Sequence, residues 1–371
     1  MNIRSGFFLV LSGAVLCLTL SCSAGGKAEE SAPFNPTILL ITDGAGENDE
    51  SFNQAAFNGI LSFYGESWNN QISRGVLYNT KRCPEESDYA EAIAEASEAR
   101  IWDVIVVTGF TFADPLMEVA PKYPKQKYMI IDTDWVHLPN AVQYAFAEHE
   151  GSFLTGAAAA LKAVFDGVEQ PSFGFIGGVA SPTITKFEVG FIQGIYSVLP
   201  DAEIVDFYAE SWTDPEGAYA QTSEWFDRGV FAVFCAAGET GIGAIDRAKE
   251  CRKQGRNVWA IGVDADQFDV GLYAPDASAV LTSMIKKAEA ATFSTLESIR
   301  NNTFKGGATV TLTLAQNGVG FTAVNPQLNP EIADRIGLMR NDIISGRIRV
   351  APGYREALNA GLVPRGLKAA D

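Results

Sequence analysis

The sequence predicts an α/β fold made of two doubly wound lobes. Short apolar runs alternate with segments of helical periodicity along most of the 371 residues, and this alternation is typical of parallel sheets covered by helices on both faces. The runs form two series, and one long helical segment, 150–165, separates them. Two such series indicate two lobes, each with its own sheet.

Each series supplies four expected strands and three expected helices. In the first, strands are expected at 37–42, 75–80, 103–109 and 127–132, and helices around 51–65, 87–100 and 113–122. In the second, strands are expected at 172–178, 202–208, 229–238 and 257–266, and helices around 183–199, 215–227 and 241–254. We expect the first lobe to comprise 36–147 and about 285–305, and the second 148–284 and about 306–371.

Residues 1–21 have the layout of a signal peptide. Arg4 precedes the apolar core "GFFLVLSGAVLCLTL", which is too short for a membrane anchor helix and is followed by no second apolar span. "LTLSC" is similar to the lipobox of bacterial lipoproteins, although Leu20 fills a position usually given to a smaller residue. Cys22 is therefore the expected acylated residue, with ordinary secretion and a free Cys22 as the alternative. Residues 22–35 are expected to form a flexible tether.

Charge and cysteine content exclude several classes. The net charge of −17 argues against a nucleic-acid partner, whose phosphates would be repelled. Cys83, Cys235 and Cys251 have neither disulfide nor zinc spacing, so we expect small buried thiols. The glycines at 238–243 lack dinucleotide spacing, and no cofactor is expected.

The turn after the first expected strand is unusually acidic. It reads "DGAGENDESFNQ" and places Asp43, Glu47, Asp49 and Glu50 where many α/β proteins hold a phosphate at the helix N-terminus. Asp49 or Ser51 can cap the helix, and capping alone is one interpretation. Four acids beside glycines suggest that at least one of them reaches a ligand.

Other chemically useful residues also follow strands. These are Phe110, Asp132, Trp212, Gly238 and Asp264, and Lys286 lies in "VLTSMIKK". Ligands of such sheets bind outside the carboxyl ends of the strands, so two facing lobes would share one hinged cleft, as in periplasmic-type binding proteins of the type I-like class. Carboxylates suit hydroxyl and amino groups, and aromatic faces suit flat rings. The cleft thus predicts a flat, neutral, hydroxyl-bearing ligand.

Several motifs resemble one family. "DGAGENDESFNQAAFNG", "EHEGSFLTGAAAA", "GFIGGVASPTITKFEVGFIQG", "AIGVDADQ" and "GRIRV" are similar, between about 36 and 352, to the basic membrane protein family of bacterial lipoproteins, and most of all to its purine nucleoside receptors. The resemblance implies a substrate-binding component of an ABC importer, partnered by permease and ATPase subunits. It would bind guanosine, inosine or adenosine and be held at the cell membrane by its lipid, facing the periplasm or exterior. We expect a monomer.

The resemblance also assigns roles to individual residues. A purine would lie between Trp212 and an aromatic of the first helix, for which Phe57 is preferred and Phe52 is the rival. Asn48 and Asp49 would address the polar edge of the base. The ribose would be held by Asp132, Asp264 and Lys286, with backbone contact from Gly238; Asp264 and Lys286 can also pair with each other. The family's Asp-Asp-Lys-Ser-Phe-Asn reads Asn-Asp-Glu-Ser-Phe-Asn here, which leaves the exact base open.

Four alternatives stay open, of which one, a surface adhesin or signalling module, rests on lipid anchoring alone and predicts no tight small ligand. Paired carboxylates could support glycoside hydrolysis, as in a nucleoside hydrolase, but no arrangement of nucleophile and base is evident beside His137 and His149, and we do not expect an enzyme. A receptor for a sugar or another small molecule would use the same residue types. A calcium site at Asp43, Glu47 and Asp49 lacks EF-hand spacing.

Overall fold

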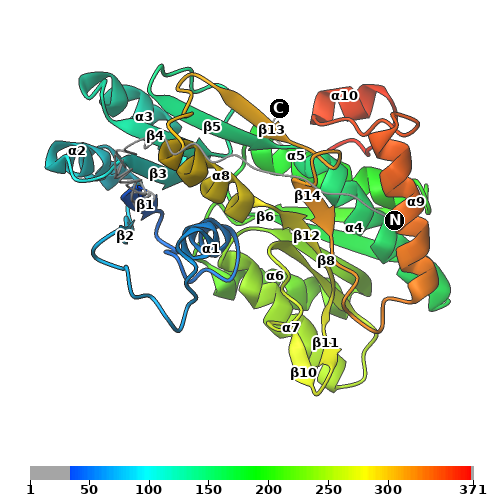
Figure 1. The fold of residues 1–371 in the computed structure, drawn as a ribbon. Helices are drawn as coiled ribbons and strands as arrows, with labels where there is room; N and C mark the ends of the chain where they lie inside the picture. Colours follow the sequence, from blue (N-terminus) through cyan, green and yellow to red (C-terminus); the bar gives the residue numbers. More distant parts are fainter. Residues whose placement is uncertain (1–33, 369–371) are drawn as a thin grey trace, which may run out of the picture. The chain divides into compact units, whose positions relative to one another are not determined.

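Two six-stranded sheets organise the protein in the computed structural model, which describes residues 34–368 (Figure 1). The strand orders are β13-β5-β4-β3-β1-β2 and β14-β12-β9-β8-β6-β7. All neighbouring strands are parallel except β14, which is antiparallel to β12. The predicted α/β class is confirmed. The signal peptide, Cys22 and nearly all of the predicted tether lie outside the described residues.

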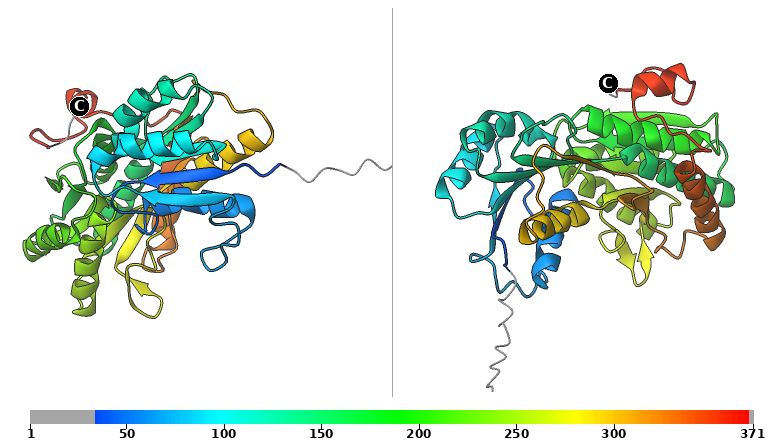
Figure 2. Two further views of the ribbon diagram at one scale, coloured as in Figure 1. Left: turned by 90° about the vertical axis from the view of Figure 1, so that its left-hand side faces the viewer. Right: turned by 45° about the horizontal axis from the view of Figure 1, so that its top comes forward.

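The first sheet is covered on both faces by helices. Its strands are β1 (Ile38–Thr42), β2 (Tyr78–Arg82), β3 (Val104–Thr108), β4 (Lys127–Ile131), β5 (Ala141–Phe146) and β13 (Thr309–Leu312). Its helices are α1 (Phe52–Tyr64), α2 (Tyr89–Ala99), α3 (Ala113–Val119) and α8 (Ala288–Arg300), with short 3-10 turns η1 (Glu86–Asp88), η2 (Phe110–Phe112) and η3 (Ala120–Lys122). Because side chains alternate along a strand, Ile38 and Leu40 pack with α1 and α8, whereas Leu39 and Ile41 pack with α2 and α3. Figure 2 shows α8, in gold, beside α1, in blue.

The second sheet has the same layered arrangement. Its strands are β6 (Ser172–Gly177), β7 (Glu203–Tyr208), β8 (Val230–Ala236), β9 (Trp259–Asp264), β12 (Val280–Lys286) and β14 (Val319–Phe321), with a hairpin of β10 (Leu272–Ala274) and β11 (Ala277–Ser278). Its helices are α4 (Glu148–Phe165), α5 (Pro182–Tyr196), α6 (Pro215–Asp227), α7 (Thr240–Lys253), α9 (Pro330–Ile344) and α10 (Tyr354–Asn359). Helices α4 and α5 touch backbone to backbone, because a Cβ at Gly194 would lie 2.0 Å from the Phe153 carbonyl oxygen.

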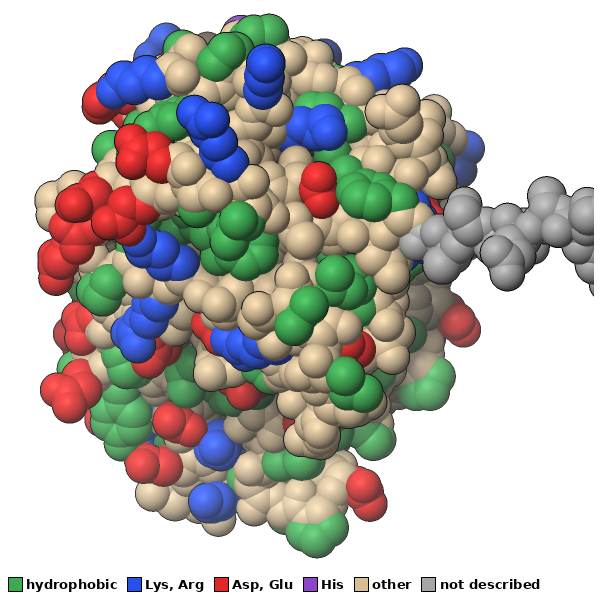
Figure 3. All heavy atoms as spheres, turned by 60° about the vertical axis from the view of Figure 1, so that its left-hand side comes forward, with side chains coloured by type: hydrophobic (Ala, Val, Ile, Leu, Met, Phe, Trp, Pro, Cys, Tyr) green, Lys and Arg blue, Asp and Glu red, His purple; other side chains and the backbone are tan. Residues whose placement is uncertain are grey.

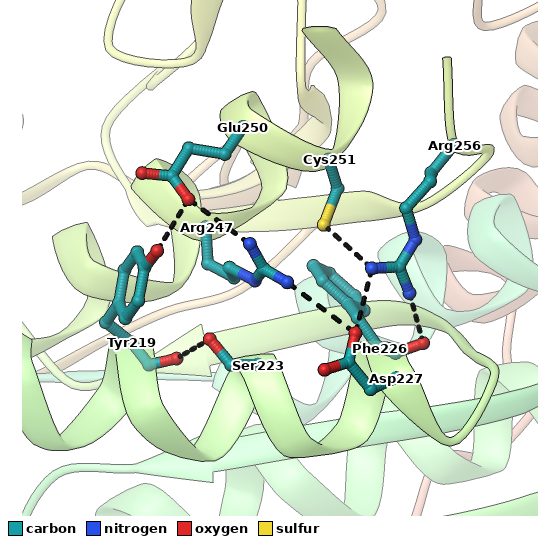
Figure 4. Close-up of polar contacts among 8 residues, drawn as sticks. All are labelled: Tyr219, Ser223, Phe226, Asp227, Arg247, Glu250, Cys251 and Arg256. Atoms are coloured by element: carbon teal, nitrogen blue, oxygen red, sulfur yellow. Dashed lines mark hydrogen bonds and ion pairs between the residues drawn. The ribbon is translucent and has the colours of Figure 1, made fainter. Parts of the chain in front are cut away.

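Charged side chains join the two helices on the opposite face. Arg247 of α7 contacts Glu250 at 3.2 Å and Asp227 of α6 at 3.6 Å, and Arg256 also binds Asp227 at 2.9 Å (Figure 4). The Cys251 thiol beside them is buried and free, as are the other two described cysteines, which confirms the expected small buried thiols. Elsewhere the surface carries many acidic side chains with basic ones among them, as on the face drawn in Figure 3.

The expected strands and helices of both series are present, with ends shifted by a few residues. Sequence reasoning did not predict β5, β12, the hairpin of β10 and β11, the edge strands β13 and β14, or the helices α8, α9 and α10. The lobe division remains a prediction, but β13 pairs with β5 in the first sheet, so the segment that returns to this sheet extends past 306 to Leu312. No helix among residues 34–368 is long and apolar enough to cross a membrane.

Candidate functional site

A pocket lies where the carboxyl ends of strands from both sheets meet. The space among its lining residues, which includes open solvent, is about 570 Å³. Seven of the nine predicted ligand-binding residues line it: Asp49, Phe52, Asp132, Trp212, Gly238, Asp264 and Lys286. Residues more than 200 positions apart in the sequence, such as Asp49 and Lys286, therefore line the same pocket, as expected for residues that follow the strand ends.

Phe57 and Asn48 do not line the pocket. The Phe57 side chain has no exposed surface and packs edge-on against Trp68 and Tyr78, with ring centroids 5.1 and 5.9 Å away. Five residues along a helix turn a side chain well away from the starting face, so Phe57 faces the core while Phe52, at the start of α1, reaches the pocket. The preference for Phe57 over Phe52 is thus corrected. Asn48 is exposed on the preceding turn.

The acidic turn divides into two pairs. Asp49 accepts hydrogen bonds from the backbone N–H groups of Ser51, Asn53 and Gln54 at 2.9–3.0 Å, so it caps α1 and still borders the pocket. Burial raises the pKa of Asp49 to about 7, although these three donors lower it. Asp43 also lines the pocket and accepts from the Asn53 side chain at 2.9 Å.

The other pair points elsewhere. Glu47 forms an ion pair with Arg74 at 2.7 Å, and Glu50 is exposed. Among the described residues no group of acids, histidines and cysteines is arranged to hold a metal ion, so the geometry gives the calcium alternative no support.

Lys286 is the cation of the pocket, and three carboxylates surround it. Its Nζ atom lies 2.6 Å from Asp132 and 3.3 Å from Glu148. Burial alone would lower the pKa of Lys286, but Asp132, Glu148 and Asp264 together raise it. The ammonium also lies within 4.9–5.2 Å of the ring centroids of Phe52, Phe146 and Phe187, which adds cation–π attraction.

Asp264 does not pair directly with Lys286, contrary to the sequence-based alternative. Its carboxylate accepts a hydrogen bond from the Ser51 hydroxyl at 2.8 Å, which links the end of β9 to the start of α1. Burial raises the pKa of Asp264, while Lys286 and Ser51 lower it. Asp132 and Asp264 both have positive φ, 73° and 64°, a conformation that Asp tolerates better than most residues.

Aromatic side chains form the remaining wall. Trp212 lies edge-on to Phe110, with ring centroids 6.0 Å apart. Gly178 makes room for the indole, because a Cβ there would lie 2.2 Å from the Trp212 ring. The Trp212 backbone is held in turn, since its carbonyl accepts from the Thr240 N–H at 3.0 Å. Trp212 is therefore fixed by its neighbours rather than free at the lobe surface.

Sequence reasoning missed three contributors. Asn53 is buried and bridges Asp43 and Thr108; Phe187 lines the pocket from α5; and Glu148 completes the Lys286 cluster. Asn53 was visible in "DESFNQ" as a polar residue on the first turn. Glu148 follows β5, and predicting that strand would have marked Glu148 as another strand-end acid.

The chemistry of the pocket favours hydrogen-bond donors and flat rings in a ligand. Asp43, Asp49, Asp132 and Asp264 line it with Lys286 as their cationic counterpart, and Lys286 is already paired. A phosphate would meet several carboxylates at short range and no unpaired cation among the described lining residues. No histidine lies among those lining residues.

Two largely parallel sheets with a pocket at their facing strand ends are the architecture of periplasmic-type solute-binding proteins. The family model described as "ABC transporter substrate-binding protein PnrA-like" matches residues 37–352, and the chain belongs to this Bmp family.

Relatives and solved structures agree with this class. The chain is 31% identical over 355 residues to the ABC transporter nucleoside-binding protein BmpA of Lactococcus lactis, covering 92% of this chain and 98% of that protein. It is 28% identical over 325 residues to an uncharacterised lipoprotein of Pyrococcus abyssi, covering 86% and 77%. A solute-binding protein structure from Aeropyrum pernix K1 superposes with a TM-score of 0.75 at 23% identity, covering 88% and 98%.

Proposed function

We propose that this protein is the lipid-anchored substrate-binding component of an ABC importer and that it binds purine nucleosides in the pocket between the two sheets. The observation that carries the proposal is that two aromatic side chains, Trp212 and Phe52, line the pocket together with buried carboxylates, while Lys286, the one cation among its described lining residues, is already paired with Asp132. A purine ring would stack on the aromatic side chains, and ribose hydroxyls would donate hydrogen bonds to the carboxylates. The nucleoside-binding relative in Lactococcus lactis supports the same substrate class.

The ribose would lie at the Lys286 end of the pocket. One Asp132 oxygen is buried without a hydrogen-bond partner, and Asp264 offers its second oxygen beyond the one that Ser51 occupies. Buried unpaired acceptors cost free energy, so two vicinal hydroxyl groups that donate to them would be strongly favoured. Lys286 orients Asp132 and can donate to a ribose oxygen.

The base would stack on the aromatic wall. Trp212 is held in place by Gly178 and Thr240, and a rigid ring loses little entropy when a base stacks on it. Asp49 and Asp43 lie on the α1 side of the pocket, where they can accept from ring or amino N–H groups. This side of the pocket would decide among guanosine, inosine and adenosine.

Mass spectrometry of small molecules released from the purified protein tests the substrate class. We expect a purine nucleoside in about equimolar amount after release by denaturation. Intact nucleoside recovered after long incubation would distinguish binding from hydrolysis, whereas accumulation of free base would indicate the hydrolase alternative. A sugar recovered in place of nucleoside would refute the proposal.

A fatty-acid probe tests the anchor separately. The Pyrococcus abyssi relative is named a lipoprotein, and acylation here is proposed at Cys22. Wild-type protein should be labelled in cells and the Cys22→Ser variant should not. Equal labelling of both would place the anchor elsewhere while leaving the pocket proposal intact.

A further inference from the structure

The end of the first sheet opposite the pocket exposes apolar side chains on an ordered loop. Ile72 and Val76 are the most exposed large apolar side chains in the described chain, at 78% and 72%, and both lie between α1 and β2, in the segment that projects as a blue loop in Figure 1. Isolated exposed apolar residues are ordinary, so their surroundings decide whether these two have a role.

Internal hydrogen bonds brace this loop. Glu66 accepts from the Ser73 N–H at 2.9 Å and from the Tyr78 hydroxyl at 2.5 Å. The Trp68 indole N–H donates to Asn58 of α1 at 2.7 Å, and the Val76 N–H donates to the Ser73 carbonyl at 3.0 Å. The loop therefore holds Ile72 and Val76 outward in a fixed conformation.

A basic groove lies along the same edge of the sheet. It is lined by Arg100, Trp102, Lys122, Tyr123, Pro124 and Lys125. Lys122 has an exposed partner in Glu118 at 3.1 Å, a contact of small energy. Arg100 and Lys125 form no ion pair within residues 34–368. Three basic side chains together are notable in a chain of net charge −17, and Ile101, 61% exposed, stands beside them.

The strand order makes the loop, the groove and the start of β1 neighbours. Ile38 pairs with Tyr78 on one side and Val104 on the other, and Val104 pairs with Lys127. At about 4.8 Å between strands, the amino edge from β4 to β2 spans roughly 15 Å. The chain that leads from Cys22 joins this edge at β1, and its twelve residues, 23–34, extend at most about 40 Å.

We propose that this amino edge of the first sheet docks on an anionic lipid surface, with Ile72, Val76 and Ile101 in the interface and Arg100, Lys122 and Lys125 against the headgroups. The inference rests on the proposed lipid anchor at Cys22. A lipid anchor and a basic patch reinforce each other in membrane binding. Because the pocket lies at the opposite ends of the strands, docking by this edge leaves it unobstructed.

The test uses the full lipidated protein in vesicles with an environment-sensitive fluorophore at Val76→Cys. The three described native cysteines are buried, which favours selective labelling. In vesicles with about 30% phosphatidylglycerol we expect a blue shift and quenching by headgroup quenchers, both weakened when salt rises from about 0.05 M to about 0.5 M. The same label at Leu338→Cys on α9, 66% exposed, should show neither a blue shift nor quenching, in these vesicles or in vesicles without anionic lipid.

A charge-removal variant supplies the matched comparison. We combine three substitutions in one variant, Arg100→Asn, Lys122→Gln and Lys125→Gln. The ratio of protein docked on the membrane by this edge to undocked protein should fall about a hundredfold, since each basic group near an anionic surface contributes roughly fivefold. Asn suits position 100 because φ is 53° there. Nucleoside affinity, measured by calorimetry, should not change in this variant.

Equal responses at positions 76 and 338, or no dependence on anionic lipid, would overturn the proposal. A response at position 76 that requires the importer's membrane subunits would overturn it too and would identify a protein partner instead. Vesicle flotation measures whether the lipid anchor holds the protein on the membrane, and calorimetry measures nucleoside binding in the pocket. Failure of docking is therefore distinguishable from failure of the proposed function.

Discussion

Lys286 shows why the charged residues of this pocket must be considered as a group. It lies among Asp132, Glu148 and Asp264, of which only the first two contact it directly. Burial raises the pKa of Asp132 to about 6, and the neighbouring Lys286 opposes that rise. Removing the lysine would leave the buried Asp132 without its ion-pair partner, which is far more costly than losing a surface pair. Lys286 thus stabilises the buried carboxylates of the pocket and also lines the pocket itself.

The two aromatic candidates on α1 give a matched pair of variants. Phe52→Ala should weaken guanosine binding by about 1–3 kcal/mol, because a stacking or contact face is lost. Phe57→Ala should lower the free energy of unfolding by about 3–5 kcal/mol through a core cavity and leave the affinity of the folded protein nearly unchanged. Calorimetry and urea denaturation of both variants separate the effects, and a larger affinity loss for Phe57→Ala would contradict the assignment.

Asp264 should distinguish nucleosides from free bases. Asp264→Ala is expected to weaken guanosine binding about ten- to hundredfold, since hydrogen bonds to a charged group contribute about 1.5–3 kcal/mol. Guanine, which has no ribose hydroxyls, should lose much less. Asp266→Ala is the control, because Asp266 is exposed two residues further on and does not line the pocket. If Asp264→Ala binds guanosine as the wild type does, Asp264 makes no ribose contact.

Among the secondary-structure elements, the end of β6 determines where Trp212 can lie. Gly178→Ala would place a methyl group 2.2 Å from the indole and displace it. We therefore expect guanosine, inosine and adenosine to weaken together, as they should for Trp212→Ala, by about 1–3 kcal/mol. The control is Gly337→Ala in α9, where no atom lies within 4 Å of the added Cβ. Loss for one base alone would rule out a stacking role for Trp212.

A buried acid couples α5 to β7 and should make stability depend on pH. Glu188 has no exposed surface, and its Oε2 atom accepts from the Tyr208 hydroxyl at 2.7 Å. Burial raises the pKa of Glu188 to about 8, from 4.5. The folded protein therefore keeps a proton that the unfolded chain releases, so this group's contribution to stability is lost as pH rises across that interval.

Glu188→Gln should remove this contribution. Urea denaturation at about pH 5 and pH 8 should show a smaller fall in unfolding free energy for the variant than for the wild type. Glu224→Gln, at an exposed ion pair with Arg228, should retain the wild-type slope. An unchanged slope in Glu188→Gln would show that the Glu188 carboxyl ionises normally in the folded protein.

At the scale of the whole molecule, periodicity was sufficient for the fold class and for most of the pocket. Apolar strands such as "VIVVT" and "WAIGV" are unambiguous, and the residues that follow them reach the pocket because parallel strands end at one edge. β13, with four residues, and β14, with three, carry no such signal, because pairing with strands distant in sequence determines them. The sequence could not separate Phe52 from Phe57, because that distinction depends on the rotation of α1 against the sheet.

The central claim is tested most directly by calorimetry. The purified protein, freed of bound ligand, is titrated with guanosine, inosine, adenosine, guanine and ribose. If the aromatic wall holds a purine and the buried carboxylates hold its ribose, each nucleoside should bind more tightly than guanine, and ribose alone should bind weakest because it forgoes stacking by about 1–3 kcal/mol. Ribose or another sugar that binds as tightly as the nucleosides would contradict the claim and establish a sugar receptor instead.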